Sequence, residues 1–250
     1  LVILLAVIGV AFAGYIVFTT PHPDTSDIYS NIHENSVIYD DQGEVLEIVS
    51  SDQIRTNVTY DVLPQDLIDA FVAVEDKTFF SHHGFNFVRM AGAVKESVTG
   101  GGNVSGTSTI TQQLARNIYL SNERSYIRKA REAYITVILE RDLTKEQILE
   151  AYLNTINLGY GSYGVQAASK AYFNKDVSQL DLAECATLAG IPKSPTKYSP
   201  LTRKPSDEVE QDNPDIVLVD EEYITVYDPT FKDRQEMILG FMLAQQLITR

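Results

Sequence analysis

Between residues 66 and 190, apolar side chains recur with the period of an α-helix, and this pattern limits the fold more than any other feature. Helix starts are marked as well, because Thr109 and Gln112 have the spacing of a capping box, as do Thr144 and Gln147. The expected helix ends are Gly159, Asn174 and Gly190. The sequence therefore predicts a mainly α domain.

The first 18 residues carry no charge, and the first charged residue is Asp24. An apolar stretch of this length nearly spans a bilayer, so residues 1–20 are predicted to form a transmembrane anchor. A cleaved signal peptide is the alternative, but its apolar region is usually shorter and ends at small residues. Only acidic charges follow until Arg55, without the basic excess of a cytoplasmic flank. The remainder of the chain is therefore expected to be extracytoplasmic.

The other segments are assigned by pattern. Residues 21–62 are predicted to be a juxtamembrane segment with a short hairpin, because apolar strands at 37–39 and 45–49 flank a turn. Three further domains are expected: the main domain at 63–200, an acidic insertion or linker at 201–232 with a second hairpin, and the start of a following helix at 233–250. Since the sequence starts with Leu and stops inside an amphipathic pattern, it is expected to be part of a longer chain.

Charge and cysteine content exclude some classes of protein. The formal net charge is -14 over 250 residues, which argues against nucleic acid as a partner. A single cysteine rules out an internal disulfide. Cys185 lies in an apolar helical run, so a core thiol is expected rather than a nucleophile.

Glu75 is the first candidate catalytic residue. A predicted helix opens near Pro64, carries Phe71 on its apolar face and ends at Glu75. Partial burial there would make the Glu75 carboxylate a usable proton acceptor or donor. Polar and aromatic residues that could bind substrate or exclude water follow closely: Asp76, Phe79, Phe80, His82 and His83. The alternative is a frayed helix end whose two aromatic residues belong to the core.

A cluster of hydroxyl and basic residues suggests an anion site. Hydroxyls at residues 107–111 open a helix, where the helix dipole favours a negative charge, although ordinary capping needs only one of them. Five basic residues and a carboxylate then follow in an otherwise acidic chain: Arg116, Arg124, Arg128, Lys129, Arg131 and Glu132. A solvated charged face is the alternative interpretation. Glu132, held among cations, is expected to stay ionised, whereas Glu75 is expected to take up a proton more readily.

Taken together, five blocks resemble the glycosyltransferase family 51 domain of class A penicillin-binding proteins and monofunctional transglycosylases. The blocks occur in order at residues 75–84, 106–113, 128–132, 148–154 and 167–175. The resemblance covers about residues 63–200. Arg116 stands where the family usually has Lys, and Gly92 stands near a position that is often basic. The acidic insertion at 206–228 is unlike the usual short linker.

The resemblance implies a lysozyme-like helical fold and a peptidoglycan glycosyltransferase that polymerises lipid-linked disaccharide-peptide (lipid II). Glu75 would be the general base, and Glu132 would act with the cations Arg116, Arg124, Arg128 and Lys129 on the donor pyrophosphate. A divalent cation (Mg²⁺ or Mn²⁺) at Glu132 is left open. Further substrate-binding candidates are Asp76, Phe79, His82, Ser108, Thr109, Gln112, Gln113 and Tyr172.

The partners implied are lipid II, growing lipid-linked glycan, the membrane, a C-terminal transpeptidase domain and cell-wall synthesis proteins. Two rival functions are kept. A lytic enzyme of similar fold would use Glu75 as an acid, but it does not need five basic residues beside a second carboxylate. A non-catalytic cell-wall binding module would leave Glu75 and Glu132 without a role.

Overall fold

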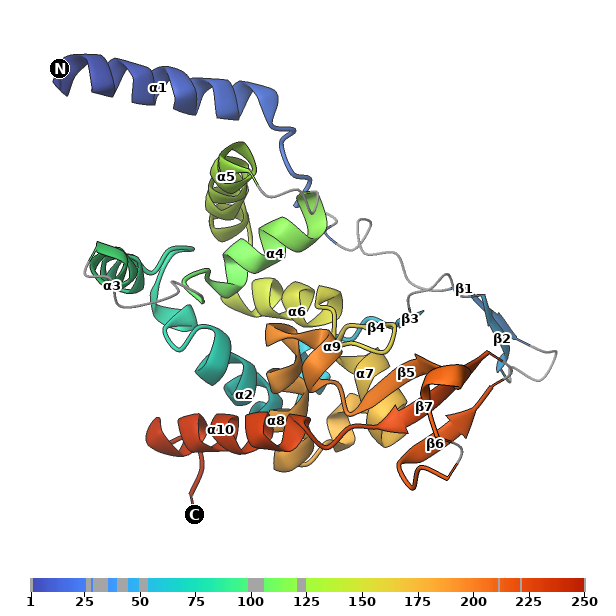
Figure 1. The fold of residues 1–250 in the computed structure, drawn as a ribbon. Helices are drawn as coiled ribbons and strands as arrows, with labels where there is room; N and C mark the ends of the chain where they lie inside the picture. Colours follow the sequence, from blue (N-terminus) through green and yellow to red (C-terminus); the bar gives the residue numbers. More distant parts are fainter. Residues whose placement is uncertain are drawn as a thin grey trace. The chain divides into compact units, whose positions relative to one another are not determined.

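The structure is a computed structural model that describes residues 2–25, 28, 36–39, 45–49, 54–98, 106–120, 125–210, 212–220 and 222–249. Helices dominate it (Figure 1), which confirms the mainly α prediction. The helices are α1 (Val2–Thr19), α2 (Gln65–Glu75), α3 (Phe87–Val98), α4 (Ile110–Tyr119), α5 (Tyr126–Asp142), α6 (Lys145–Thr155), α7 (Val165–Phe173), α8 (Leu182–Gly190), α9 (Pro195–Tyr198) and α10 (Phe231–Ala244). The strands are β1 (Ser36–Tyr39), β2 (Val45–Val49), β3 (Ile54–Arg55), β4 (Ser162–Tyr163), β5 (Leu201–Pro205), β6 (Ile216–Val219) and β7 (Tyr223–Tyr227).

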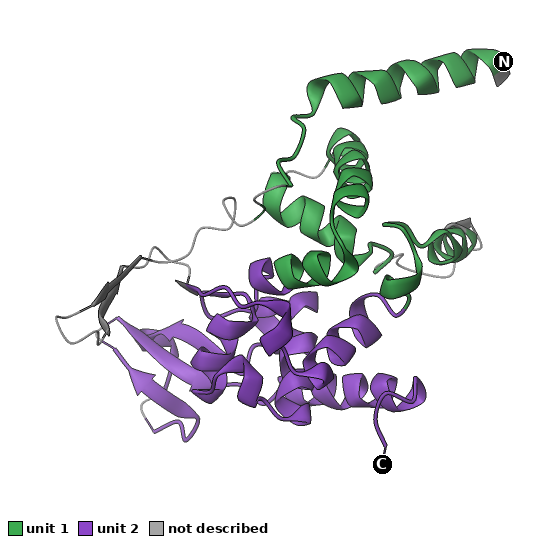
Figure 2. Cartoon of the chain, turned by 180° about the vertical axis from the view of Figure 1, so that it is seen from behind, with its two compact units in different colours: residues 1–32, 78–152 green, residues 33–77, 153–250 purple. Residues whose placement is uncertain are grey.

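The chain divides into two compact units, coloured separately in Figure 2. Unit 1 consists of residues 1–32 and 78–152, and unit 2 consists of residues 33–77 and 153–250. Each unit therefore combines segments that lie far apart in the sequence. The predicted domain boundaries at 63, 200 and 232 stay a prediction.

Unit 1 is built around the contact of α4 with α5. Thr109 caps α4, and the reciprocal hydrogen bonds with Gln112 form the predicted capping box. The large side chains with almost no exposed surface in this unit are Phe79, Ile110, Leu114, Ile135, Leu139, Ile148, Leu149 and Tyr152. These apolar residues recur at helical spacing, and burying each one contributes about 1.5–3 kcal/mol to stability.

The apolar N-terminal segment forms α1, which contacts α5 and buries Ile16. Most of its other large side chains are exposed. In the part of the chain that the structure describes, no helix combines the length and hydropathy required to cross a membrane.

Unit 2 has a helical core in which α8 contacts α2, and α10 contacts both. Gln245 Nε2 donates to the carbonyl of Ala73 at 3.2 Å, and Gln235 Nε2 donates to Thr187 Oγ1 at 2.7 Å. Cys185 is buried in α8, and burial raises the pKa of its thiol to about 12. The thiol therefore stays protonated near neutral pH, as expected of a core cysteine.

Asn154 fixes the segment that precedes α2. Its side chain is 1% exposed, accepts from Val58 N at 3.0 Å and donates from Nδ2 to Val58 O at 2.8 Å. Both backbone groups of Val58 are thus satisfied by one amide. This contact gives Asn154, the last residue of the fourth sequence block, a structural role.

The acidic segment after α9 forms a three-stranded sheet in the order β5-β7-β6. The predicted hairpin of β6 and β7 is confirmed, and the added strand, β5, pairs antiparallel with β7. Val209, Ile224 and Val226 form a small apolar cluster beside Ile216. The sheet leads directly into α10, which begins two residues before the predicted start at 233. The N-terminal strands β1 and β2 also pair as predicted, while their turn at 40–44 lies outside the described residues.

Candidate active site

The predicted anion site lies in unit 1, where Glu132 on α5 is 1% exposed. Lys129 Nζ donates to Glu132 Oε1, and Arg128 Nη1 lies 3.9 Å from Oε2. The same ammonium of Lys129 also donates to Ser108 Oγ at 3.2 Å. The structure therefore brings together Ser108 of the second sequence block with Arg128, Lys129 and Glu132 of the third.

Arg128 and Lys129 occupy the first turn of α5, after the N-cap Ser125, whose hydroxyl accepts from Arg128 N at 3.0 Å. The helix dipole is positive at this end, so placing two cations there does not stabilise the helix. The dipole and the two cations together attract an anion. Within the described residues, Arg128 Nε is buried without a hydrogen-bond partner. A buried donor of this kind calls for a ligand or water, which supports the anion site over a solvated face.

Three residues of the second block, Thr109, Gln112 and Gln113, make hydrogen bonds to other groups of the protein. Thr109 Oγ1 donates to the carbonyl of Gly84 at 2.7 Å, and the Gln112 side chain accepts from Thr109 N at 3.0 Å. Gln113 Oε1 accepts from the hydroxyl of Tyr152 at 3.4 Å. Capping thus engages Thr109 and Gln112, and Gln113 is half-buried.

Gly84 closes the first block against α5. Its φ of +83° lies in the left-handed region, and an added Cβ would stand 2.7 Å from Thr136 Cγ2. Glycine is therefore required at this position both by conformation and by space. Gly84 N also donates to His82 Nδ1 at 3.1 Å, which fixes the ring of His82.

Phe79 and Phe80 differ in environment. Phe79 is fully buried, and the Lys145 ammonium stands 4.5 Å from its ring centroid. Phe80 is 51% exposed. Phe79 is therefore a core residue, as the alternative interpretation held, and Phe80 is the aromatic residue that remains accessible.

Glu140 joins these elements and was missed by sequence analysis. Its side chain is 6% exposed, lies 2.8 Å from Lys145 Nζ through both carboxylate oxygens, and accepts from Thr111 Oγ1. Lys145 in turn covers Phe79. The Glu140 carboxylate on α5 thus connects α4, α6 and the first block. Its contact with Thr111 joins residues 29 positions apart, and no pattern in the sequence predicts such a contact.

Replacing Glu140 by Gln is expected to lower the free energy of unfolding by about 2–3 kcal/mol, because a largely buried ion pair and a charge-assisted hydrogen bond are lost together. Thermal and chemical unfolding would measure the loss. Arg141→Gln is the matched control, since its ion pair with Asp142 on the same helix is exposed and should matter little. Equal stability of Glu140→Gln and the wild type would remove Glu140 from this role.

Glu75, the candidate base, is the last residue of α2 in unit 2 and is half-buried. Asp76 follows as the C-cap, is fully buried and donates its backbone N–H to Val72 O at 3.0 Å. The predicted helix end is therefore confirmed. The catalytic role of Glu75 stays a prediction.

Tyr172, also in unit 2, is engaged by protein groups. Its hydroxyl donates to the carbonyl of Leu158 at 2.6 Å and shares a hydrogen bond of 2.9 Å with Ser199 Oγ. Burial raises the pKa of the Tyr172 hydroxyl above its ordinary value, so the group stays neutral. These contacts favour the scaffold role for Tyr172 over the predicted contact with substrate.

Arg116 lies in the last turn of α4 and is half-buried, while Arg124 lies outside the described residues. Among the described residues, no group of three or more His, Cys, Asp or Glu side chains could hold a metal ion. Glu132 is also engaged by cations, so this arrangement does not fit a metal site built by the protein alone. A divalent cation stays a prediction from family resemblance, and no step below depends on one.

Comparison with known proteins identifies the family. The family model described as Transglycosylase matches residues 42–219. Penicillin-binding protein 1A of Clostridium botulinum is 39% identical over 254 residues, which cover 94% of this chain and 30% of the relative. Penicillin-binding protein 1A of Clostridium tetani is 43% identical over 79% of this chain and 26% of the relative. Penicillin-binding protein 1F of Bacillus subtilis is 38% identical over 90% and 32%.

The chain thus spans about a third or less of the length of these relatives. A crystal structure of Penicillin-Binding Protein 1A from Haemophilus influenzae aligns with a TM-score of 0.42 and 23% identity, over 88% of this chain and 20% of the other. The family match confirms the resemblance to glycosyltransferase family 51 that the five sequence blocks carry. The chain belongs to the transglycosylase family.

Proposed function

We propose that this domain polymerises lipid II into glycan strands, with growing lipid-linked glycan as donor and lipid-linked disaccharide-peptide as acceptor. The acceptor hydroxyl oxygen forms a bond to the anomeric carbon of the donor, the bond from that carbon to the pyrophosphate oxygen breaks, and the proton goes to a base. The observation that carries the proposal is the cluster of Lys129, Arg128 and Ser108 around the buried Glu132, within a chain of this family.

The acidic and basic residues of the site have different roles in the proposed reaction. Glu75 accepts the proton of the acceptor hydroxyl, which makes the oxygen a better nucleophile. Arg128 and Lys129, with Arg116 and Arg124, neutralise the charge that develops on the departing pyrophosphate. Glu132 orients Lys129 for that task, because it accepts a hydrogen bond from the ammonium while Ser108 accepts another.

A polymerisation assay with lipid II in detergent tests this proposal directly. A glycosyltransferase yields long glycan strands together with free lipid pyrophosphate. A lytic enzyme instead shortens preformed glycan, and a binding module changes neither substrate. Absence of polymer under conditions in which the protein is folded would refute the proposed reaction.

Removing the cations Arg128 and Lys129 of α5 should weaken donor use while the fold survives. Charge-assisted contacts contribute about 1.5–3 kcal/mol each, so the Arg128→Ala and Lys129→Ala double variant should lose at least about tenfold in donor affinity. Arg141→Ala is the matched control, because Arg141 lies on the same helix and pairs with Asp142 instead. Normal polymerisation by the double variant would show that these cations form only a solvated helix face and do not bind the donor.

We also propose that α1, with any residues that precede it, anchors the domain at the outer surface of the cytoplasmic membrane. The support is its uncharged sequence and its exposed apolar side chains. Protease added to intact spheroplasts should digest the domain, and a variant without residues 2–19 should be released from membranes. Full protection would contradict the orientation, and release of the unaltered protein into the medium would contradict the anchor.

A further inference from the structure

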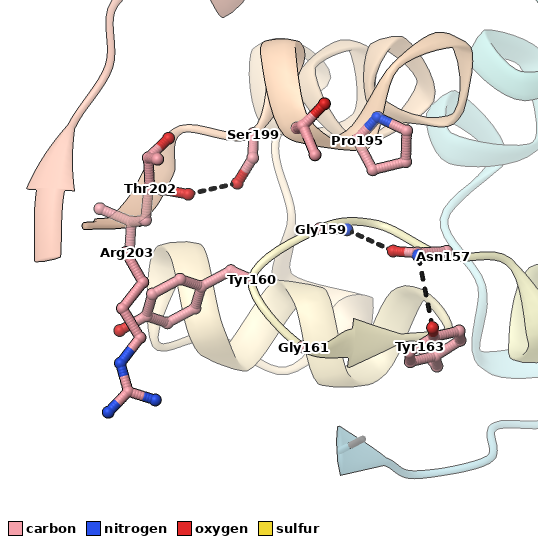
Figure 3. A pocket seen from close by; sticks show the side chains of 11 residues that line it. Asn157, Gly159, Tyr160, Gly161, Tyr163, Pro195, Ser199, Thr202 and Arg203 are labelled. Atoms are coloured by element: carbon pink, nitrogen blue, oxygen red, sulfur yellow. Dashed lines mark hydrogen bonds between the residues drawn. The ribbon is translucent and has the colours of Figure 1, made fainter. Parts of the chain in front are cut away.

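Unit 2 contains a pocket of about 410 Å³, and none of the residues that line it is proposed above for catalysis. One wall is the loop from Asn157 to Tyr163, which joins α6 to β4 and α7. The opposite wall comes from α9 and β5, and Figure 3 shows Pro195 and Ser199 across from Gly159 and Asn157. The volume falls within the range of about 300–1,000 Å³ that is usual for small-molecule sites.

The loop wall is held rigidly by hydrogen bonds. Gly159 N donates to Asn157 Oδ1 at 2.8 Å, and Asn157 Nδ2 donates to the Tyr163 hydroxyl at 3.4 Å, both drawn in Figure 3. Gly159, Tyr160 and Gly161 all have positive φ, a conformation that favours glycine. An added Cβ at Gly159 would stand 2.9 Å from the Pro195 carbonyl. The close approach of the two walls therefore depends on glycine.

The charges of the lining exclude most ligand classes. Arg203 is the only formally charged residue of this lining, and its Nη2 lies 3.1 Å from the Asp220 carboxylate. No lining residue is acidic, so the pocket offers a cation no carboxylate partner. Because Asp220 pairs with Arg203, the lining presents little net positive charge to an anion. An uncharged ligand is the remaining class.

The polar groups of the pocket indicate the kind of uncharged ligand. Tyr160 and Tyr163 contribute flat apolar rings with hydroxyl groups at their edges, and the Arg55 guanidinium, which is not part of the lining, lies 4.6 Å from the Tyr163 ring centroid. Thr196 and Thr202 add neutral donors and acceptors. A sugar ring presents apolar C–H faces with hydroxyls around its edge, which matches aromatic rings bordered by hydroxyl groups.

We propose that this pocket binds an uncharged saccharide of one or two rings, and that in the working enzyme the saccharide is part of the glycan strand. The preference for a neutral saccharide follows from the pocket alone, whereas its identity as glycan rests on the proposed function. Thr202 and Arg203 belong to β5, so the strand that precedes the acidic insertion supplies part of the site.

Binding can be measured by calorimetry with a soluble tetramer of β-linked N-acetylglucosamine, with maltotetraose for comparison. The obstructing variant is Thr196→Trp, because Thr196 lines the pocket and is exposed, so a larger side chain fills the space without displacing the core. Val217→Trp is the matched control, since Val217 is 57% exposed on β6 and outside the pocket. Wild type and Val217→Trp should bind alike, and Thr196→Trp should bind at least about tenfold more weakly, a difference of about 1.4 kcal/mol.

A second readout needs no variant. Backbone amide shifts of Gly161 and Thr202 should move on titration of the tetramer, whereas those of Gly240, on α10 away from the pocket, should not. Equal binding by all three proteins, or shifts confined to other residues, would overturn the pocket as the site. Absence of saccharide binding by the wild type would overturn the ligand class. Binding without any lipid II polymerisation would refute the proposed function alone and leave the neutral-saccharide site standing.

Discussion

Glu75→Gln should lower the turnover of lipid II polymerisation by about 10²–10⁴-fold, the usual contribution of a general base. Glutamine keeps the size and hydrogen-bonding capacity of the side chain but cannot accept a proton. Glu75 is half-buried at the end of α2, and the preceding turns hold it through the buried residues Phe71 and Val72. The helix should therefore survive the substitution, and affinity for a lipid pyrophosphate ligand should change little.

Asp69→Asn is the matched control for Glu75→Gln. Asp69 is a carboxylate on the same helix that accepts from Gln65 Nε2 at 2.9 Å, and it has no proposed part in the reaction. Turnover, ligand affinity and thermal unfolding are compared in one detergent. Wild-type turnover in Glu75→Gln would remove Glu75 from catalysis, while simultaneous loss of turnover, affinity and folded signal would make it a structural residue.

Local features of the fold were predictable because their causes are local. The capping boxes at Thr109 and Thr144 depend only on a hydroxyl and a glutamine three residues apart, and both are present in the structure. Asn174 ends α7 with a φ of 53°, as its tolerance of the left-handed region suggested. The basic cluster was predictable for a similar reason, since Arg128, Lys129 and Glu132 share one helix.

Contacts between distant residues were not predictable in this way. Glu140 and Lys145 occur in ordinary helical patterns, and only the packing of α4 against α5 brings Thr111 to the same carboxylate. The sequence of β5 contains Arg203 and Lys204 and is typical of a solvent-exposed segment. It forms a strand because its backbone pairs with the unpaired edge of β7. Tyr172 is a substrate-binding candidate through the family resemblance, but its hydroxyl is occupied by Leu158 and Ser199, which are 14 and 27 residues away.

Glu132→Gln is the second substitution with a large expected effect. The negative charge of Glu132 is the partner of Lys129, and its removal leaves a glutamine of the same size among the cations. The site then attracts pyrophosphate at least as strongly as before, because a charge that repels the ligand has gone. Affinity for a lipid pyrophosphate ligand is therefore expected to stay the same or to rise.

Turnover by Glu132→Gln should nevertheless fall by about 10²–10³-fold, the usual cost of losing an oriented electrostatic contact to the transition state. Lys129 is 49% exposed, so without its partner the ammonium can turn toward solvent or toward the bound phosphate instead of the oxygen that leaves. Tighter binding of the ground state does not accelerate the reaction, since only interactions that strengthen in the transition state raise kcat. The expected signature is thus a lower kcat with an unchanged or lower KM.

Glu146→Gln is the matched control for Glu132→Gln, because Glu146 is an exposed carboxylate of unit 1 on α6 and should leave both constants unchanged. Steady-state kinetics with lipid II, a direct binding measurement and thermal unfolding separate the possible outcomes. A parallel fall in affinity and unfolding temperature would show that Glu132 only supports α5. Unchanged turnover would show that departure of the pyrophosphate does not require an oriented Lys129. The cluster around Glu132 would then contribute to substrate binding alone.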